Sequence, residues 1–382
     1  MRLGIVAVLI ALTAILVPQH GVHLKAQSRK SATAAPDSDQ PLVVAKQGSF
    51  FVNEQNIATA FPDGDGRRAP GHISVKGMYV QYQIPATRTP GVYPVIMVHG
   101  FGHTGKTYEE TPDGRMGWAE YFVRRGVPVY VVDHSGRARS GFDPTPTNQA
   151  LREKNAALIP SFAEFTNENA WTSFRFGPTA FTPYGTTRFP VAARDQYFAQ
   201  IVPNTETSYE GAGDNTVRAL AALVDRIGPA VLLVHSQSGA YGIAAAVARP
   251  GSIKGVVSVE PRSCAVSDEN VSAVFTRVRL LTIFGDFFGT NVSDWPGRIA
   301  ECVETVTRIK TARGIAENIH LPDRGIRGNS HMLMMDTNNL QVADIILAVA
   351  YRQGSLIPSG SHEVGQGDGG GRRRCGRIAR QS

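Results

Sequence analysis

Short apolar runs that alternate with stretches of helical periodicity constrain this fold more than any other feature. Each run is bounded by Gly, Pro or Asp and is apolar on both faces, as a strand in the middle of a protein should be. Strands separated by helices pair in parallel, so we predict an α/β fold with a mainly parallel sheet and helices on both faces. The runs are residues 95–99, 127–133, 231–235, 255–259 and 280–284, with an earlier strand around 78–83, and the helical stretches are 117–125, 215–227, 239–249, 298–313 and 340–352.

One connection is longer than a crossover needs. It joins the runs at 127–133 and 231–235, and its residues 144–209 are dense in Phe, Tyr, Trp and Pro. A segment this long within a sheet is typically a lid or an inserted subdomain. We therefore expect a cap at about 144–209, inserted into a domain that spans residues 49–352. Above the carboxyl ends of the strands, it would cover a pocket.

The two ends of the chain differ from its middle. A basic start at Arg2 and an apolar run at residues 3–17 predict a signal peptide, cleaved after Ala26. The alternative is an uncleaved membrane anchor, for which the apolar run is short. Residues 27–48 are expected to form a flexible leader, and residues 353–382, rich in Gly, Ser and Arg, a disordered basic tail. The sequence therefore predicts a secreted or periplasmic protein with no stable membrane association after signal cleavage.

Charge and composition argue against several partners. The formal net charge is +7, but arginines of the tail and basic residues near the start carry most of it. The body is nearly neutral, so no nucleic-acid partner is expected. The sequence contains no metal-ligand or nucleotide-binding pattern, and we expect neither a metal nor a cofactor.

Export also bears on the cysteines, because an oxidising compartment permits disulfides. Cys264 and Cys302 both lie within the predicted domain, whereas Cys375 lies in the tail. We therefore expect one intramolecular disulfide, between Cys264 and Cys302.

A candidate nucleophile follows the apolar run at residues 231–235. The sequence His-Ser-Gln-Ser-Gly-Ala leads from this run into an Ala-rich helix, which is the order of a nucleophile elbow. The tight turn requires small residues two positions before and after the serine, and Ser236 and Ala240 meet this rule around Ser238. We therefore predict Ser238 as the nucleophile, although a serine here could also simply cap the helix.

A second element of the same chemistry precedes it. The stretch His-Gly-Phe-Gly follows an earlier strand, where elbow-containing folds place an oxyanion donor. The backbone N–H groups of Phe101 and Gly239 are expected to form the oxyanion hole. Gly102, Trp171 and Phe174 are expected to contact substrate, although aromatic residues of a cap often only pack it onto the body.

A serine nucleophile needs a general base late in the chain. His331 lies in a Gly-led loop before the last helix, whereas His320 lies in an apolar run typical of a strand. His331 is therefore the predicted base. Two carboxylates at strand ends, Asp286 and Glu260, could orient its ring, and the residues alone leave this choice open.

Five longer motifs stand out: His-Ser-Gln-Ser-Gly, Val-Ser-Val-Glu-Pro, Gly-Asn-Ser-His-Met, Thr-Pro-Asp-Gly-Arg-Met-Gly-Trp and Phe-Arg-Phe-Gly-Pro. Together they resemble a small family of secreted bacterial serine esterases in the α/β-hydrolase superfamily, and the similarity spans residues 47–352. The resemblance implies that Glu260, after the sixth strand, is the triad acid, and that cysteines occur at positions 264 and 302. The pair Phe101-Gly102 departs from the family, whose members can carry cysteines there.

The resemblance and the motifs together predict a carboxylic ester hydrolase that acts on small-molecule esters. His331 would deprotonate Ser238, an acyl-enzyme would form, and water would release the acid. An amidase or a polyester-cleaving hydrolase would differ only in its pocket. The alternative from another class is a catalytically inactive binding protein on the same fold. The sequence makes no prediction of the oligomeric state.

Overall fold

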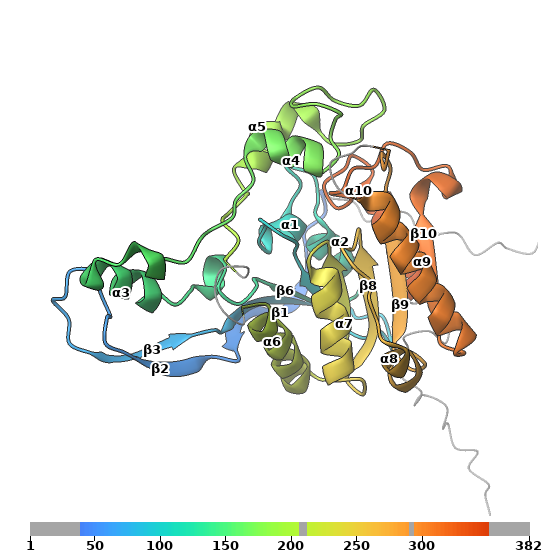
Figure 1. Cartoon of the computed structure of the whole chain (residues 1–382). Helices are drawn as coiled ribbons and strands as arrows, with labels where there is room; N and C mark the ends of the chain where they lie inside the picture. The colour runs from blue at the N-terminus through green and yellow to red at the C-terminus, as the bar shows by residue number, and fades with distance from the viewer. Residues whose placement is uncertain (1–38, 206–211, 290–293, 351–382) are drawn as a thin grey trace, which may run out of the picture. The chain divides into compact units, whose positions relative to one another are not determined.

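The computed structural model of the chain describes residues 39–205, 212–289 and 294–350 (Figure 1). An eight-stranded sheet runs through this part of the chain. Its order is β1 (Val44–Val52), β4 (Met78–Pro85), β6 (Val129–Val132), β5 (Val95–Val98), β7 (Ala230–His235), β8 (Ile253–Val259), β9 (Arg279–Phe284) and β10 (Ala316–His320). β4 pairs antiparallel with β1 and β6, and all other neighbours pair in parallel. The predicted mainly parallel sheet is confirmed.

Alternation along the central strands divides the core between the two faces of the sheet. Val95 and Met97 of β5 belong to one apolar cluster, and Ile96 and Val98 belong to the other. Successive side chains of a strand point to opposite faces, so a strand covered on both sides must be apolar throughout. This explains why these strands are visible in the sequence as continuous apolar runs.

Helices cover both faces (Figure 1). Side chains of α2 (Trp118–Arg124) and α10 (Asn339–Ala350) pack in the first cluster. The second cluster contains side chains of α6 (Ala212–Ile227), α7 (Ser238–Ala248), α8 (Asp268–Ala273) and α9 (Trp295–Thr311). The predicted disulfide between Cys264 and Cys302 is present and joins the segment after β8 to α9.

Between β6 and α6 the chain leaves the sheet, in the region where the cap is expected. This segment contains the helices α3 (Thr145–Glu153), α4 (Asn167–Ser173) and α5 (Arg194–Phe198) and the 3₁₀ turns η2 (Ala156–Leu158) and η3 (Val191–Ala193). Two further short elements, α1 (Lys106–Glu109) and η1 (Ala138–Ser140), follow β5 and β6, and η4 (Leu321–Arg324) follows β10. We refer to residues 144–205 as the cap.

The structure adds strands that the sequence analysis does not predict. β2 (Gln55–Thr59) and β3 (Gly71–Val75) form a separate two-stranded antiparallel sheet beside α3 (Figure 1), where Thr59 and Thr145 are joined by a hydrogen bond of 2.9 Å. β1 begins at Val44, so the leader predicted for residues 27–48 extends too far. Most β1 side chains are at least partly exposed, and its first half lacks the apolar alternation that marks a strand.

The predicted signal peptide at 1–26 and the predicted tail at 353–382 lie outside the described residues. Within the described ranges, no helix is long and apolar enough to cross a membrane. The same part of the chain contains no group of three or more His, Cys, Asp or Glu side chains that could hold a metal ion.

Candidate active site

Two loops meet at the carboxyl ends of the neighbouring strands β5 and β7. A Cβ atom on Gly100 would lie 2.7 Å from His235 Nδ1 and 3.0 Å from Ser236 Cβ. Any larger residue at position 100 would therefore collide with the turn after β7, and glycine allows the two loops to approach. The His-Gly-Phe-Gly stretch and the predicted elbow are thus brought together.

Ser236 occupies the tight turn between β7 and α7. Its φ of 52° lies in the left-handed region that non-glycine residues avoid, and such strain is concentrated at functional sites. Its carbonyl oxygen accepts the N–H groups of Gly239 and Arg262, at 3.0 Å each, and its N–H donates to Val259 at 3.0 Å. The residue is partly exposed. A strained, accessible serine between a strand and a helix has the geometry of a nucleophile elbow.

Ser238 lies two residues further on, at the first position of α7. It is 0% exposed, and its hydroxyl donates a hydrogen bond to the carbonyl oxygen of His99. The same oxygen lies 2.8 Å from Nε2 of His134. A hydroxyl enclosed and bonded in this way cannot reach a substrate, so the prediction of Ser238 as nucleophile is wrong. The strand continues through His235, and the turn that strains the backbone therefore falls at Ser236.

Of the two predicted oxyanion donors, Phe101 and Gly239, the structure argues against Gly239. The N–H of Gly239 donates to Ser236 and is not available to a substrate. In contrast, the N–H groups of Phe101 and Gln237 donate to no acceptor within the described residues. Gln237 follows Ser236, and Phe101 lies in the loop after β5, and these are the two positions from which elbow folds take oxyanion donors.

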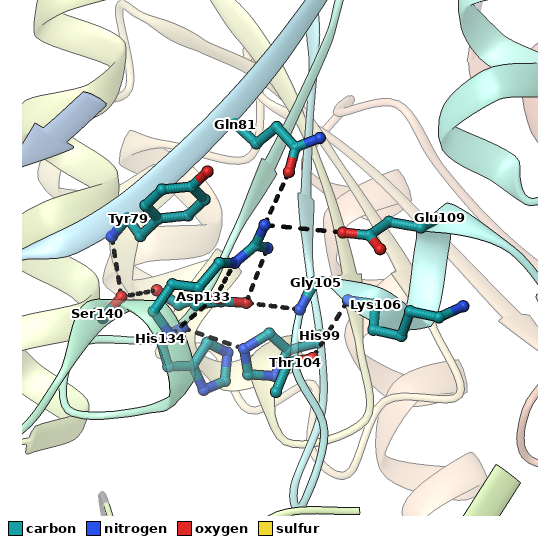
Figure 2. Close-up of polar contacts among 11 residues, drawn as sticks. Tyr79, Gln81, His99, Thr104, Gly105, Lys106, Glu109, Asp133, His134 and Ser140 are labelled. Atoms are coloured by element: carbon teal, nitrogen blue, oxygen red, sulfur yellow. Dashed lines mark hydrogen bonds and ion pairs between the residues drawn. The ribbon is translucent and has the colours of Figure 1, made fainter. Parts of the chain in front are cut away.

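Figure 2 shows how the loop after β5 is fastened to the end of β6. The buried Asp133 carboxylate accepts the N–H of Gly105 at 2.7 Å and the Nε of Arg139 at 2.6 Å. The N–H of His134 donates to His99 Nε2 at 3.1 Å. These contacts fix both ends of the loop that carries Phe101.

His331 and Glu260 are in direct contact. His331 Nδ1 lies 3.0 Å from Glu260 Oε2, and both side chains are buried. The other carboxylate oxygen accepts the N–H of Gly285 and pairs with Arg175 Nη2 at 2.7 Å. Burial raises the pKa of Glu260, but the Arg175 charge and the His331 hydrogen bond outweigh it and hold this pKa below its usual value. The carboxylate is therefore ionised.

Asp286, the other candidate acid, forms no hydrogen bond with His331 within the described residues. Its Oδ1 accepts the N–H of Phe287 at 2.8 Å and its Oδ2 the N–H of Gly328 at 3.0 Å. Its carbonyl oxygen accepts Arg175 Nε at 2.8 Å. Asp286 thus orders backbone near the site.

The loop that carries His331 is held from two sides. On the body, the buried Asp336 carboxylate accepts hydrogen bonds from the backbone and hydroxyl of Ser330 and from Asn329 Nδ2. Burial raises the pKa of Asp336 to about 6. On the cap, Phe174 accepts the His331 N–H at 2.9 Å, and the two rings are parallel with centroids 5.5 Å apart. The cap therefore contributes directly to the position of His331.

The protonation of His331 suits a base. Burial lowers its pKa below 6.5, although Glu260 acts in the opposite direction. Because Nδ1 donates to Glu260, the lone pair of the neutral ring is on Nε2. The carbonyl of His331 accepts a hydrogen bond from the ring of His235, the residue before Ser236, at 3.0 Å. No hydrogen bond joins Ser236 to His331 in the described part of the chain, and catalytic bonds of this kind often tighten only with substrate.

The three predicted substrate contacts have different surroundings. Gly102 has a φ of 68°, and its carbonyl accepts the N–H of Val202 from the cap at 2.9 Å. Phe174 lies against His331, as described. Trp171 is instead fully buried inside the cap, where its Nε1 donates to Thr182. Trp171 therefore packs the cap, the second role that the sequence left open, and does not reach a substrate.

Sequence reasoning missed Ser236, Gln237 and Arg175. Gln237 follows from the elbow rule once the nucleophile is placed at Ser236. Arg175 lies in the Phe-Arg-Phe-Gly-Pro motif, whose length marks it as specific, but no local pattern connects it to Glu260, 85 positions later.

A mainly parallel sheet, a strained serine between a central strand and a helix, and a histidine paired with a buried carboxylate define an α/β hydrolase. A solved structure described as that of a novel bacterial esterase is 39% identical, covers 81% of this chain and 96% of its own, and superposes with a TM-score of 0.77. A probable secreted lipase, phiG, of a fungal species (strain ATCC 74256) is 28% identical over 321 residues, which are 72% of this chain and 86% of that protein.

No family model matches the sequence. The identity to the bacterial esterase, over nearly its whole length, nevertheless shows that the chain belongs to the esterase- and lipase-like α/β hydrolases. The predicted class, an ester hydrolase on this fold, is confirmed at the level of the family.

Proposed function

We propose that the chain hydrolyses small-molecule carboxylic esters, with Ser236 as nucleophile, His331 as general base and Glu260 as the acid that orients His331. The observation that carries the proposal is the strained φ of 52° at Ser236, directly beside Gly100 of the loop after β5. A strained turn of this kind is how α/β hydrolases expose a nucleophile to an oxyanion hole. The relatives named esterase and lipase support the choice of an ester substrate.

In the first step, Nε2 of His331 takes the proton of Ser236 as its oxygen attacks the ester carbonyl. The negative charge of the tetrahedral intermediate is held by the N–H groups of Phe101 and Gln237, for which the described residues provide no other acceptor. Gln237 also occupies the position before the first residue of α7, where the helix dipole favours an anion.

In the second step, His331 returns the proton to the leaving alcohol, and an acyl group remains on Ser236. Water, deprotonated by His331, then attacks the acyl group, and His331 passes this proton to the Ser236 oxygen as the bond to the acyl group breaks and the acid is released. Throughout, the Glu260 carboxylate stabilises the imidazolium that forms on His331. Gly285 and Arg175 support this role because they keep the carboxylate fixed and ionised.

The assignment is tested by comparing Ser236→Ala with Ser238→Ala on p-nitrophenyl esters from acetate to palmitate, with a matched anilide as amide control. Ser236→Ala should lower kcat by about four to six orders of magnitude, as expected for a nucleophile that acts with its base as a unit. Ser238→Ala removes only a buried hydroxyl and should retain a substantial part of the activity. A fluorophosphonate probe should label the wild type and Ser238→Ala, but not Ser236→Ala. Labelling that survives in Ser236→Ala, or is lost only in Ser238→Ala, would reject the assignment.

We further propose that the protein is exported. The disulfide between Cys264 and Cys302 and the similarity to a probable secreted lipase support an extracellular location. Fractionation of the native host would distinguish culture medium from periplasm, and recovery in the cytoplasm with both thiols free would contradict the proposal.

A further inference from the structure

Arg137 lies between β6 and η1 and contacts both parts of the proposed oxyanion hole. Its side chain is buried, with 2% of the residue exposed. One nitrogen, Nη1, donates to the carbonyl oxygens of Gly100 at 2.8 Å and His103 at 3.1 Å. The other, Nη2, lies 3.5 Å from the side-chain oxygen of Gln237. One guanidinium thus joins the loop after β5 to the turn after β7.

The contact with Gly100 acts on Phe101, because the carbonyl of Gly100 and the N–H of Phe101 belong to one planar peptide group. In a trans peptide the two bonds point in opposite directions, so a donor that fixes the carbonyl also fixes the direction of the N–H. A guanidinium that donates two hydrogen bonds fixes the carbonyl well, because its planar group has little freedom to rotate.

The ring of His99 holds the same carbonyl. His99 Nε2 accepts the N–H of His134, so the proton of this ring must be on Nδ1, which donates to the Gly100 oxygen at 3.0 Å. Burial, followed by the charges of His134 and Arg137, lowers the pKa of His99, and the ring is neutral. The Gly100 oxygen therefore accepts one neutral and one charge-assisted hydrogen bond.

A charged donor also changes the strength of the peptide N–H. Hydrogen bonds from an ionised group are about twice as strong as neutral ones, and connected bonds strengthen one another by about 10–30%. Because Arg137 draws electron density toward the Gly100 oxygen, the Phe101 N–H becomes a stronger donor. The effect is largest where water is excluded, as it is around this buried side chain.

We propose that Arg137 is the positioning residue of the oxyanion hole: it orients and polarises the Gly100–Phe101 peptide and holds the Gln237 side chain on the other side. The inference rests on the proposed function, because Phe101 and Gln237 matter in this way only if Ser236 is the nucleophile. Within the described residues, Arg137 forms no hydrogen bond with Ser236 or His331, so its role is separate from proton transfer.

The test replaces Arg137 by Met and by Lys in the full chain. Met removes the charge at similar length, and kcat for a short-chain p-nitrophenyl ester should fall by about 10- to 100-fold, less than the loss of a whole oxyanion donor. KM should change by less than about threefold, because the charge on the oxyanion develops only in the transition state. Lys keeps the charge and one contact with Gly100, and should recover part of the lost kcat.

Arg175→Met is the matched comparison. Arg175 is also fully buried, but it pairs with Glu260 and donates to the carbonyl oxygen of Asp286, and not to the carbonyl oxygen of Gly100. Its loss should shift the pH profile of kcat/KM, which reports His331, whereas the Arg137 variants should keep the wild-type profile. A second readout is the carbonyl stretching frequency of a ¹³C-labelled, slowly hydrolysed cinnamoyl-enzyme. It should rise in Arg137→Met, because a weaker oxyanion hole polarises the acyl carbonyl less, and remain unchanged in Arg175→Met.

Melting temperature and near-ultraviolet circular dichroism establish whether each variant folds. If Arg137→Met does not fold, the inference is tested by the kcat and the acyl carbonyl frequency of Arg137→Lys. Folded variants with wild-type kcat and an unshifted acyl carbonyl would overturn the inference, as would a kcat loss accompanied by a displaced pH profile. Activity that persists in Ser236→Ala would instead reject the proposed function itself. An inactive Ser236→Ala together with unaffected Arg137 variants would reject only the role of Arg137.

Discussion

At the scale of single residues, the two serines of the turn after β7 show what a local rule can decide. Ser238 satisfies the rule of small neighbours, whereas Ser236 has Val234 two positions before it. The structure accommodates this valine through the facing helix, since a Cβ on Gly242 of α7 would lie 3.0 Å from Val234 Cγ1. The space that the elbow needs is thus supplied by Gly242, six positions after the serine, and the rule applied to nearest neighbours selected the wrong residue.

A second question at this scale is which carboxylate, Glu260 or Asp286, orients His331. Two isosteric variants answer it. Glu260→Gln leaves the imidazolium without a charged partner and permits the wrong tautomer of His331, so kcat/KM should fall by about 10²- to 10⁴-fold. Asp286→Asn should cost less than about tenfold, because Asp286 accepts only backbone N–H groups. Both are measured with the same neutral ester. A more damaging Asp286→Asn would show that Glu260 is not the acid.

At the scale of elements, buried strands and helices could be predicted and exposed ones could not. β5, β7 and β8 are apolar on both faces, and the continuous runs that predict them follow from this burial. The β2–β3 hairpin alternates between exposed and partly buried positions over only five residues a strand, and its sequence carries no comparable signal. The disulfide could be predicted because only two cysteines lie within the domain.

The disulfide gives the prediction at this scale. Cys264 and Cys302 enclose a loop with a sequence separation of 38, and the bond restricts the unfolded chain more than the folded one. Replacing both by Ala should lower the free energy of unfolding by about 2 to 4 kcal/mol. Urea titration of the double variant and of the oxidised parent measures the difference. Activity at room temperature should be largely retained, and an unchanged midpoint of unfolding would contradict this account.

At the scale of the whole molecule, the site gathers at one edge of the sheet because parallel strands end at the same edge. Ser236, Glu260 and His331, the residues of the proposed triad, follow β7, β8 and β10 in that order. The chain order of the proposed nucleophile, acid and base could therefore be predicted from the order of the strands. The contacts between the cap and the site could not be predicted in this way. They join residues about 85 to 160 positions apart, through a backbone hydrogen bond and a buried ion pair. The periodicity of the sequence carries no signal for contacts of this kind.

The prediction at this scale is that activity extends to mildly acidic pH. Only the neutral ring of His331 accepts a proton, and its pKa is lowered below 6.5, so the acid limb of kcat/KM should be centred below that value. The pKa of Glu260 is also lowered, and the carboxylate remains charged over the same range. A pH series with a neutral ester measures the limb, and a midpoint above the usual histidine value of 6.5 would contradict the prediction.

The contacts of Phe174 and Arg175 limit how the cap of this enzyme could be exchanged for another. Phe174 accepts the N–H of His331, and the next residue, Arg175, pairs with Glu260, yet both follow α4 in the cap. A chimaera that exchanged the cap for that of a relative, in order to alter specificity, would therefore also exchange the supports of the base and its acid. Grafting would have to retain the peptide around Phe174 and Arg175 and vary only the remainder. An exchange of the whole cap would therefore alter the surroundings of His331 and Glu260 as well as those of the substrate.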